Sequence, residues 1–355
     1  MSDKPKQLHP YYSFDKVFSY NAYFNFIVGG RGLGKTYGAK KKAIKAAITN
    51  GEQFIYLRRY KEELTDSVRT FFDDLVANGE FDDYDFRVNG RQFEYSGIEF
   101  RDEKKREWHL AGMAMALSQG QAKKSMALPL VTLIIFDEFI IEKGHMRYLP
   151  FEYNVFQGLY STVDRWKDKT RVLFLANAVS IDNPYFVFYG IIPEEGQQWI
   201  HGKKVTLKDG RKVNYICAHF PVAGEFAASV SKTAFGQFIA GTEYEAFAIS
   251  NKFADNDNRL IGDKVATARY KYTIITHKGR FSVWRDANMG AYYIQKKLPN
   301  NQLFFTLEDA FVDEDVILLL RNDPMLNFLR AAFRRGRMFF DEPLTRTAFM
   351  EVFKR

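Results

Sequence analysis

One glycine-rich stretch, GGRGLGKT from Gly29 to Thr36, constrains this sequence most. An apolar segment, 25–28, precedes it, and a segment rich in Lys and Ala, 36–47, follows it. This order predicts a strand, a tight loop and a helix. Glycines let such a loop curl so that its backbone N–H groups face inward at the positive end of the helix, where phosphate binds. The stretch therefore predicts a nucleotide-binding loop.

The spacing within this loop assigns tasks to its residues. It matches the pattern of a glycine, four residues, and then Gly-Lys-Thr. In that pattern Lys35 reaches the β and γ phosphates, while the Thr36 hydroxyl is a ligand of Mg²⁺. We expect ATP with Mg²⁺ to be bound by the whole stretch, namely Gly29, Gly30, Arg31, Gly32, Leu33, Gly34, Lys35 and Thr36.

A second apolar segment ends in two acids. The near-continuous β-branched run 130–136 is typical of a strand buried on both faces of a parallel sheet, and we expect it to be central. Asp137 and Glu138 follow it directly. Unpaired carboxylates beside a core are costly, so the pair needs a reason. Asp137 can hold the Mg²⁺ shell and Glu138 can polarise the attacking water, which favours hydrolysis over binding alone.

Asn177 ends a further apolar segment, 171–176. The carboxyl ends of neighbouring parallel strands share one crevice, where a neutral amide can sense the γ-phosphate or the attacking water. By position alone, a turn residue is an equally good interpretation.

Hydrolysis also needs a cation against the charge that develops on the γ-phosphate, and an arginine of a neighbouring subunit often supplies it. Sequence spacing does not choose among the available cations, and each of them also fits a solvated surface residue. The candidates are Arg31, Arg58, Arg59, Lys61, Lys124, Arg147 and Arg165.

Composition narrows the partners. The 355 residues suggest about two domains, and a net charge of +8 favours a polyanionic partner, with nucleic acid the leading class. Cys217 is the only cysteine, which excludes intrachain disulfides and Cys-based metal sites. No apolar run approaches the ~18 residues of a membrane span. We therefore expect a soluble, intracellular protein with no membrane partner.

The order of strand and helix signals predicts the domain organisation. Strands alternating with helices up to about residue 200 favour an α/β fold with a largely parallel sheet. Within it we expect a hairpin between 86 and 110 and helices over 61–75 and 151–165. The basic stretch around 203–212 predicts a hairpin or linker module.

A second, α+β domain is expected beyond this stretch. Its predicted strands are 267–276, 280–286, 291–297 and 303–306, and its predicted helices are 316–320 and 326–334. The predicted limits are 1–200 for the first domain, 201–228 for the linker module and 229–355 for the second domain.

The chain resembles the DNA-packaging ATPases of small tailed phages with protein-primed genomes, distant relatives of large terminases and of the FtsK/HerA translocases. The likeness covers nearly the whole chain, in NFIVGGRGLGKTYGAKK, GEQFIYLRRYKEEL, LIIFDEFIIEK, the ANAVS and NPYF stretch, FIAGTEYE and GRFSVWRDANMGAYYI. The resemblance implies a P-loop NTPase of the additional-strand class that uses a catalytic glutamate.

The family implies an activity and a set of partners. It implies a homomeric ring, a pentamer, at the portal vertex of a prohead, where the ring pumps double-stranded DNA inward. The portal, or connector, and a structural prohead RNA are the further partners. The implied location is the host cytoplasm, with a transient stay at the portal vertex.

The resemblance also implies roles by local match. The nucleotide-site residues keep the tasks given above, with Glu138 as the catalytic glutamate and Asn177 in a coupling motif. Arg165 matches an arginine finger that acts across the subunit interface. Lys124 matches a second basic residue acting there, and Lys61 matches a lysine near the nucleotide.

For the second domain the resemblance implies a ribonuclease H-like fold, which in large terminases cuts DNA with clustered acids and two metals. Such a site needs an acid in the middle of the first strand, and RYKYTIITHKG has none. The remaining acids are isolated: Asp286, Glu308, Asp309 and Asp313. We therefore expect a nuclease fold without nuclease chemistry. Two alternatives stay open, a terminase-like protein with an active nuclease and a P-loop regulator that is not a motor.

Overall fold

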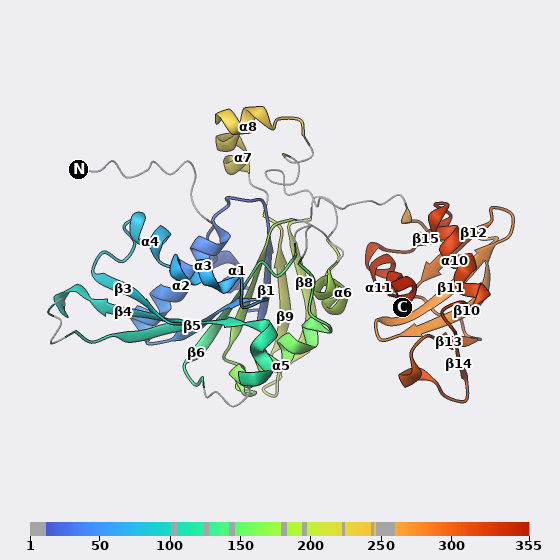
Figure 1. Ribbon diagram of the computed structural model, residues 1–355, viewed down its shortest axis with the longest axis horizontal. Coiled ribbons are helices and arrows are strands. Elements are labelled where there is room, and N and C mark those ends of the chain that lie inside the picture. The colour runs from blue at the N-terminus through green and yellow to red at the C-terminus, as the bar shows by residue number, and fades with distance from the viewer. Residues whose placement is uncertain are drawn as a thin grey trace. The chain divides into compact units, whose positions relative to one another are not determined.

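The computed structural model describes residues 12–100, 102, 106–123, 128–141, 146–178, 183–193, 197–221, 224–242, 245 and 260–354. The chain divides into two compact units (Figure 1). The first consists of Met1–Ser180 and Pro193–Ala254, and the second of Ile181–Ile192 and Asp255–Arg355. Among the described residues, no helix is both long enough and apolar enough to cross a membrane.

The first unit is built on a nine-stranded sheet in the order β3-β4-β5-β2-β6-β7-β1-β9-β8. The strands from β5 to β9 in this order run parallel, and an antiparallel hairpin closes each end. The bounds are β1 Phe24–Val28, β2 Gln53–Arg58, β3 Tyr84–Asn89, β4 Gln92–Gly97, β5 His109–Ala116, β6 Val131–Asp137, β7 Arg171–Ala176, β8 Trp199–Thr206 and β9 Lys212–His219. The predicted α/β, largely parallel sheet is confirmed, with β6 at its centre.

Helices lie on both faces of this sheet, with α2 on one face and α5 on the other. The helices of this unit are α1 Asp15–Ser19, α2 Lys35–Asn50, α3 Leu64–Arg69, α4 Asp73–Ala77, α5 Glu152–Asp164, α7 Gly224–Val230 and α8 Ala234–Phe238, with 3₁₀ turns at Ile98–Phe100 and Leu117–Lys123. The prediction of one continuous helix over 61–75 was wrong. The chain forms two short helices there, α3 and α4, with a break between them.

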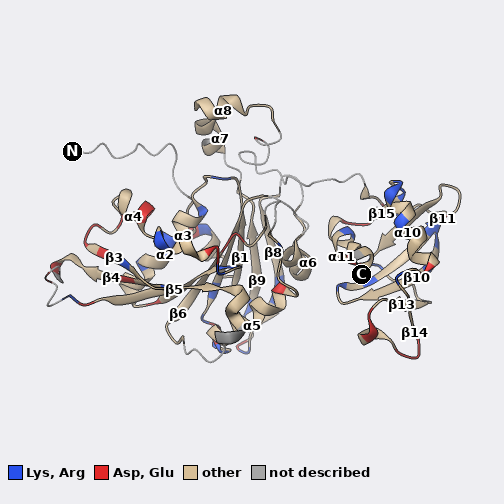
Figure 2. Ribbon diagram, viewed as in Figure 1, with Lys and Arg blue, Asp and Glu red and all other residues tan. Residues whose placement is uncertain are grey.

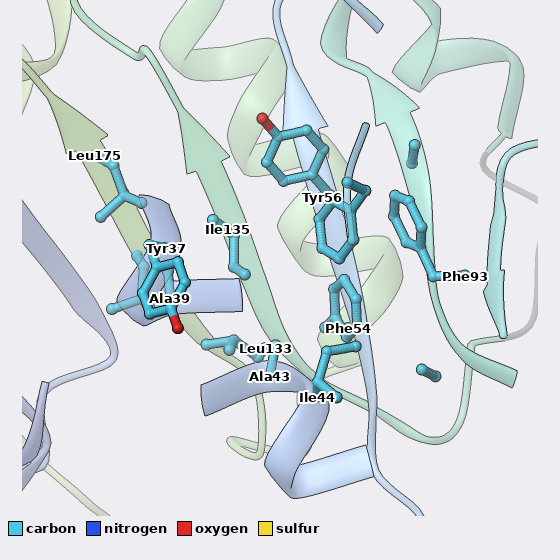
Figure 3. Close-up of a cluster of buried hydrophobic side chains, with 14 of the residues drawn as sticks. Tyr37, Ala39, Ala43, Ile44, Phe54, Tyr56, Phe93, Leu133, Ile135 and Leu175 are labelled. Atoms are coloured by element: carbon cyan, nitrogen blue, oxygen red, sulfur yellow. The ribbon is translucent and has the colours of Figure 1, made fainter. Parts of the chain in front are cut away.

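Alternation along the strands explains the two layers. Leu133 and Ile135 of β6 belong to a cluster of buried hydrophobic side chains on one face of the sheet (Figure 3). Ala43 and Ile44 of α2 belong to the same cluster. Phe136, the next residue of β6, points to the other face and stacks on Phe156 of α5 at 5.9 Å between ring centroids. The central strand is therefore buried on both faces, as its continuous apolar run predicts.

The second unit holds a six-stranded sheet in the order β14-β13-β10-β11-β12-β15. Its elements are α6 Pro184–Tyr189, β10 Arg269–Thr276, β11 Gly279–Asp286, β12 Ala291–Gln295, β13 Phe304–Thr306, a 3₁₀ turn Asp309–Phe311, β14 Val316–Leu318, α10 Pro324–Arg334, β15 Met338–Phe340 and α11 Pro343–Lys354. The four predicted strands and the helix at 326–334 are confirmed. The helix predicted at 316–320 was wrong, because β14 pairs in parallel with β13 and a five-residue apolar run does not distinguish the two periods.

The basic stretch around 203–212 forms a hairpin, since β8 and β9 pair antiparallel. The hairpin belongs to the first sheet, because β9 also pairs in parallel with β1. The three domain limits taken from the sequence, and the ribonuclease H-like fold of the second domain, stay predictions.

Candidate nucleotide-binding site

The glycine-rich loop joins β1 to α2, as the sequence predicts. Gly32 and Gly34 have φ angles of 79° and 78°, which are strained for a residue with a side chain. At Gly29 a Cβ atom would lie 2.9 Å from Cγ of Pro221. The loop therefore requires glycine at these three positions, and its backbone curls directly before the start of α2.

Lys35 is buried inside this loop. Its Nζ donates to the carbonyl oxygens of Gly29 at 2.9 Å and Gly30 at 2.8 Å, and to Oδ1 of Asn177 at 3.3 Å. Burial lowers the Lys35 pKa to about 8, with Asp137 opposing the shift and Arg31 adding to it. Burial disfavours the charged form of this lysine, and a phosphate bound in the loop would favour it again. The position of Lys35 at the start of α2 therefore fits a phosphate site.

Asn177 reaches the site because β7 lies between β6 and β1 in the sheet. Its side chain therefore meets Lys35 at the carboxyl ends of adjacent parallel strands. This juxtaposition is the one that the sequence predicts.

Thr36 and Asp137 meet across the same edge. The Thr36 hydroxyl donates to Oδ1 of Asp137 at 3.0 Å, and the hydroxyl of Tyr56 donates to Oδ2 at 2.9 Å. Burial, followed by the Asp137 charge, raises the Tyr56 pKa well above its usual value, so the phenol stays a donor. A hydroxyl and a carboxylate side by side are ligands of the kind that Mg²⁺ prefers, so the residues fit the ion.

Glu138 lies beside a second cation. Its backbone has a φ of 56°, and its side chain is 58% exposed. Oε2 of Glu138 accepts from Nη2 of Arg58 at 2.6 Å, and the same guanidinium is 3.6 Å from Oδ2 of Asp137 and 3.3 Å from Oε1 of Glu63. Burial opposes the charge of Arg58, but these acids and Tyr56 more than offset it and raise the Arg58 pKa. One guanidinium therefore serves as the counter-ion of three carboxylates.

Arg59 is a structural cation. It is 1% exposed, and its Nε donates to Oε2 of Glu152 at 2.8 Å. Nη1 donates to the carbonyl oxygen of Glu138 at 3.2 Å, and Nη2 donates to that of Phe139 at 2.6 Å. Arg59 thus fixes the backbone at Glu138 and links it to the start of α5.

Arg165 lies far from this site within one chain. It caps the carboxyl end of α5, a helix of 13 residues and so about 20 Å long, which begins near the acids at Glu152. The turn after it contacts the start of β6, because the Thr170 hydroxyl donates to the Val131 carbonyl oxygen. The seven residues of β6 span about 20 Å before they reach Asp137. Both paths put Arg165 at the sheet edge opposite its own nucleotide loop.

The remaining candidate cations differ in position. Arg31 is exposed in the loop, and Lys61 is exposed in the turn after β2. Arg147 is exposed, and its carbonyl oxygen accepts from the Tyr60 hydroxyl at 2.8 Å. Lys124 lies outside the described residues. Nothing in these positions tests the roles that the resemblance gives Lys61 and Lys124.

Two of the acids in the second unit have structural partners. The Asp286 carboxylate accepts from the Thr267 hydroxyl and from the backbone N–H groups of Asn288 at 2.8 Å and Met289 at 3.0 Å. These bonds, that from Thr267 first, lower its pKa. Glu308 accepts from the backbone N–H of His277 at 3.0 Å. Over the described part of the chain, no group of three or more His, Cys, Asp and Glu side chains is arranged to hold a metal ion.

Sequence reasoning missed the residues that support the site. Tyr56, Glu63 and Glu152 bind the acids or the arginines. Tyr56 and Glu63 lie in the stretch GEQFIYLRRYKEEL, but the resemblance gave neither of them a role. The available signal was the arginine pair at the end of β2, Arg58 in the strand and Arg59 directly after it, since a buried strand that ends in two cations requires nearby anions.

Comparisons with known proteins agree with this geometry. A family described as the Podovirus DNA encapsidation protein (Gp16) matches residues 6–355. The DNA packaging protein of Bacillus phage B103 is 34% identical over 342 residues, which cover 96% of this chain and 99% of that protein. The DNA packaging protein of Bacillus phage phi29 is 34% identical over 348 residues, which cover 97% of each. A chain of the solved bacteriophage Phi-29 viral genome packaging motor assembly matches with a TM-score of 0.73 and 33% identity, over 97% of this chain and 98% of that chain.

Proposed function

We propose, since this chain belongs to the Podovirus DNA encapsidation protein (Gp16) family, that it hydrolyses ATP to drive double-stranded DNA into a phage prohead. The observation that carries the proposal is the convergence of Lys35, Thr36, Asp137 and Glu138 at one edge of the sheet. The packaging proteins and the motor assembly named above support its coupling to DNA.

The residues of the loop would hold the nucleotide. Gly29 to Gly34 would surround the phosphates with N–H groups, and Lys35 would turn from the loop carbonyls toward the β and γ phosphates. Thr36 and Asp137 would hold Mg²⁺, which supplies charge neutralisation at the phosphates when it is bound. Oδ1 of Asn177 lies 3.3 Å from Nζ of Lys35, so movement of Lys35 toward the phosphates would alter this hydrogen bond at the end of β7.

Glu138 is the proposed general base for the attacking water. In the described arrangement its carboxylate accepts from Arg58, so it has to leave that partner to receive a proton from water. The 58% exposure of its side chain leaves it room to move, whereas Arg59 fixes its backbone. The carboxylate can therefore swing while its main chain stays in place.

The arginine finger is proposed to act between subunits. Arg165 lies about 20 Å from the acids of its own chain, by the lengths of α5 and β6. A cation at that distance cannot touch the γ-phosphate of its own site, whereas a neighbour in a ring can receive it. We propose a homomeric ring, a pentamer, with Lys124 as a second cation at the interface and Lys61 near the nucleotide.

The proposed partners are duplex DNA, the portal and a prohead RNA, with the ring in the host cytoplasm and, transiently, at the portal vertex. The second unit is proposed to have a ribonuclease H-like fold without nuclease chemistry, because Asp286 and Glu308 are engaged in local hydrogen bonds. Basic residues of α10 and of the β8–β9 hairpin are available for non-selective contacts to DNA phosphates (Figure 2).

An ATPase assay with and without duplex DNA tests this proposal. We expect DNA to stimulate hydrolysis, and Glu138→Gln to bind ATP but not to turn it over. Glu314→Gln, an exposed acid of the second unit, is the matched control and should retain full activity. Near wild-type turnover by Glu138→Gln would overturn the site assignment. Hydrolysis that is indifferent to DNA would favour the non-motor regulator.

A further inference from the structure

We propose that Trp166 anchors a contact between two copies of this chain, in which the turn 165–170 of one copy docks beside Met146 and Phe151 of the next. The inference rests on the proposed function, because that function gives Arg165 a target in a second copy. The inference adds two elements to that function: Trp166 as the residue that holds Arg165 at the second copy, and the surface at Met146 and Phe151 that receives the turn.

Trp166 is exposed in a way that a single chain does not explain. Its side chain is 87% exposed, more than any other large apolar side chain among the described residues. Tryptophan is enriched among the residues that dominate binding energy at protein interfaces, because its ring buries a large area with few rotatable bonds. Arg165, its neighbour in sequence, is also exposed. The two together form an apolar and cationic tip.

The turn holds this tip in a fixed conformation. The Asp164 carboxylate, 3% exposed, accepts from the backbone N–H groups of Asp168 at 3.0 Å, Lys169 at 3.0 Å and Thr170 at 2.9 Å. Arg165, Trp166 and Asp168 have φ angles of 52°, 59° and 55°, which are strained for residues other than glycine. A turn fixed in this way loses little conformational entropy when it docks.

The opposite edge of the sheet offers the complementary surface. Phe151 is 49% exposed and Met146 is 41% exposed, beside the acidic end of β6. The segment is joined to that end, because Glu152 accepts from Arg59 and Arg59 donates to the carbonyl oxygen of Glu138. This edge therefore combines exposed apolar side chains with an exposed carboxylate.

These two surfaces lie at opposite ends of α5, so they cannot meet within one chain. A contact between two different surfaces of identical copies is head-to-tail, and such contacts form a ring when the rotation between copies closes. The second copy is the occupant that fits both the charges and the position.

Mixed cross-linking tests the contact directly. Cys217 is buried, so an introduced cysteine provides the reactive thiol. Trp166→Cys and Phe151→Cys are prepared as separate full-length variants, mixed with ATP and DNA, and oxidised. A disulfide needs Cα atoms within about 7 Å, so we expect covalent dimers in the mixture and none in either variant alone. Phe238→Cys, exposed on α8, replaces Trp166→Cys as the control and should give no dimer with Phe151→Cys.

The protein concentration needed for activity gives a second readout. Trp166→Ala should raise the concentration for half-maximal DNA-stimulated hydrolysis by about tenfold, since interface anchors have effects of at least this size. Phe238→Ala should leave it unchanged, whereas Arg165→Ala should lower the maximum itself. Trp166 is almost wholly exposed, so its removal does not disturb the core.

The outcomes separate the two proposals. Wild-type protein with DNA-stimulated hydrolysis, but without mixed dimers and with an unchanged concentration curve for Trp166→Ala, would overturn the anchor and leave the motor standing. Dimers of Trp166→Cys alone would overturn the head-to-tail arrangement. Mixed dimers in a protein whose hydrolysis ignores DNA would support the anchor and contradict the proposed function.

Discussion

Arg58 binds Glu138 at 2.6 Å through the same guanidinium that faces Asp137 at 3.6 Å and Glu63 at 3.3 Å. The acid proposed to activate water and the acid proposed to hold Mg²⁺ thus share one buried counter-ion. Its Nε has no hydrogen-bond partner within the described structure. Arg58 is therefore the electrostatic support of the site and, in the proposed hydrolysis, the group that Glu138 has to leave.

Replacing Arg58 should destabilise the fold. Arg58→Gln leaves Asp137 and Glu63, whose side chains are 9% and 10% exposed, without their cation. Removing one partner of a buried ion pair costs about 3–5 kcal/mol, and we expect a loss of about 3 kcal/mol in the free energy of unfolding, measured with urea. Arg69→Gln breaks the exposed pair with Asp66 and should change it by less than about 0.5 kcal/mol. Equal effects of the two substitutions would contradict this account.

ATP binding should take up protons at alkaline pH. Burial lowers the Lys35 pKa to about 8, so at pH 8.5–9 the free site holds a largely neutral amine. Phosphate beside it favours the ammonium, so binding adds a proton and affinity falls as the pH rises above 8. Calorimetry in two buffers of different ionisation enthalpy should give different heats at pH 9 and nearly equal heats at pH 6.5. Buffer-independent heats at pH 9 would show that Lys35 does not gain a proton.

The free energy of unfolding should fall in acid through His219. Burial, with a smaller effect of Lys16, lowers the His219 pKa to about 4, and its ring stacks on Trp199 at 3.7 Å. The unfolded ring takes a proton near pH 6.5 and the folded ring does not. This stability is present above pH 6.5 and is lost as the pH falls toward 4. Denaturation at pH 7 and at pH 5 should show that the free energy of unfolding falls less between these pH values for His219→Gln than for the wild type. Equal decreases in the two proteins would count against the lowered His219 pKa.

Asp286 should matter for the fold of the second unit and not for DNA cleavage. Its carboxylate accepts two backbone N–H groups in the turn between β11 and β12. We expect the wild-type protein not to cut DNA with Mn²⁺, and Asp286→Ala to lower the melting temperature. Asp309→Ala, an exposed acid near the same sheet, should leave the melting temperature unchanged. Mn²⁺-dependent cleavage that disappears in Asp286→Ala would establish the terminase-like alternative.

Local sequence explains most of what could be predicted. The glycine-rich loop, the apolar strands and the acids at the end of β6 are encoded within short segments, so their elements and their common edge follow from pattern and topology. The segment 316–320 shows the limit of that logic, because pairing with β13 decides its conformation.

Contacts between distant segments could not be predicted from one sequence. Arg59 and Glu152 are 93 residues apart, and only the folded chain shows that they form a buried pair. Tyr56 likewise appears in the sequence as one more apolar residue of a strand, although its hydroxyl donates to Asp137. The distance of Arg165 from its own loop could be predicted only in part. It follows from the lengths of α5 and β6, but only once the sheet order is known.

The central claim is that Arg165 completes the site of a neighbouring subunit. The direct measurement is the DNA-stimulated ATPase rate of mixtures of Glu138→Gln and Arg165→Ala subunits at constant total protein. Each variant alone should be inactive, and mixtures should regain activity with a maximum near equal amounts. The reason is that an Arg165→Ala subunit keeps Glu138 in its site and can receive Arg165 from a neighbouring Glu138→Gln subunit. Activity that stays at the level of the separate variants at every ratio would contradict the account.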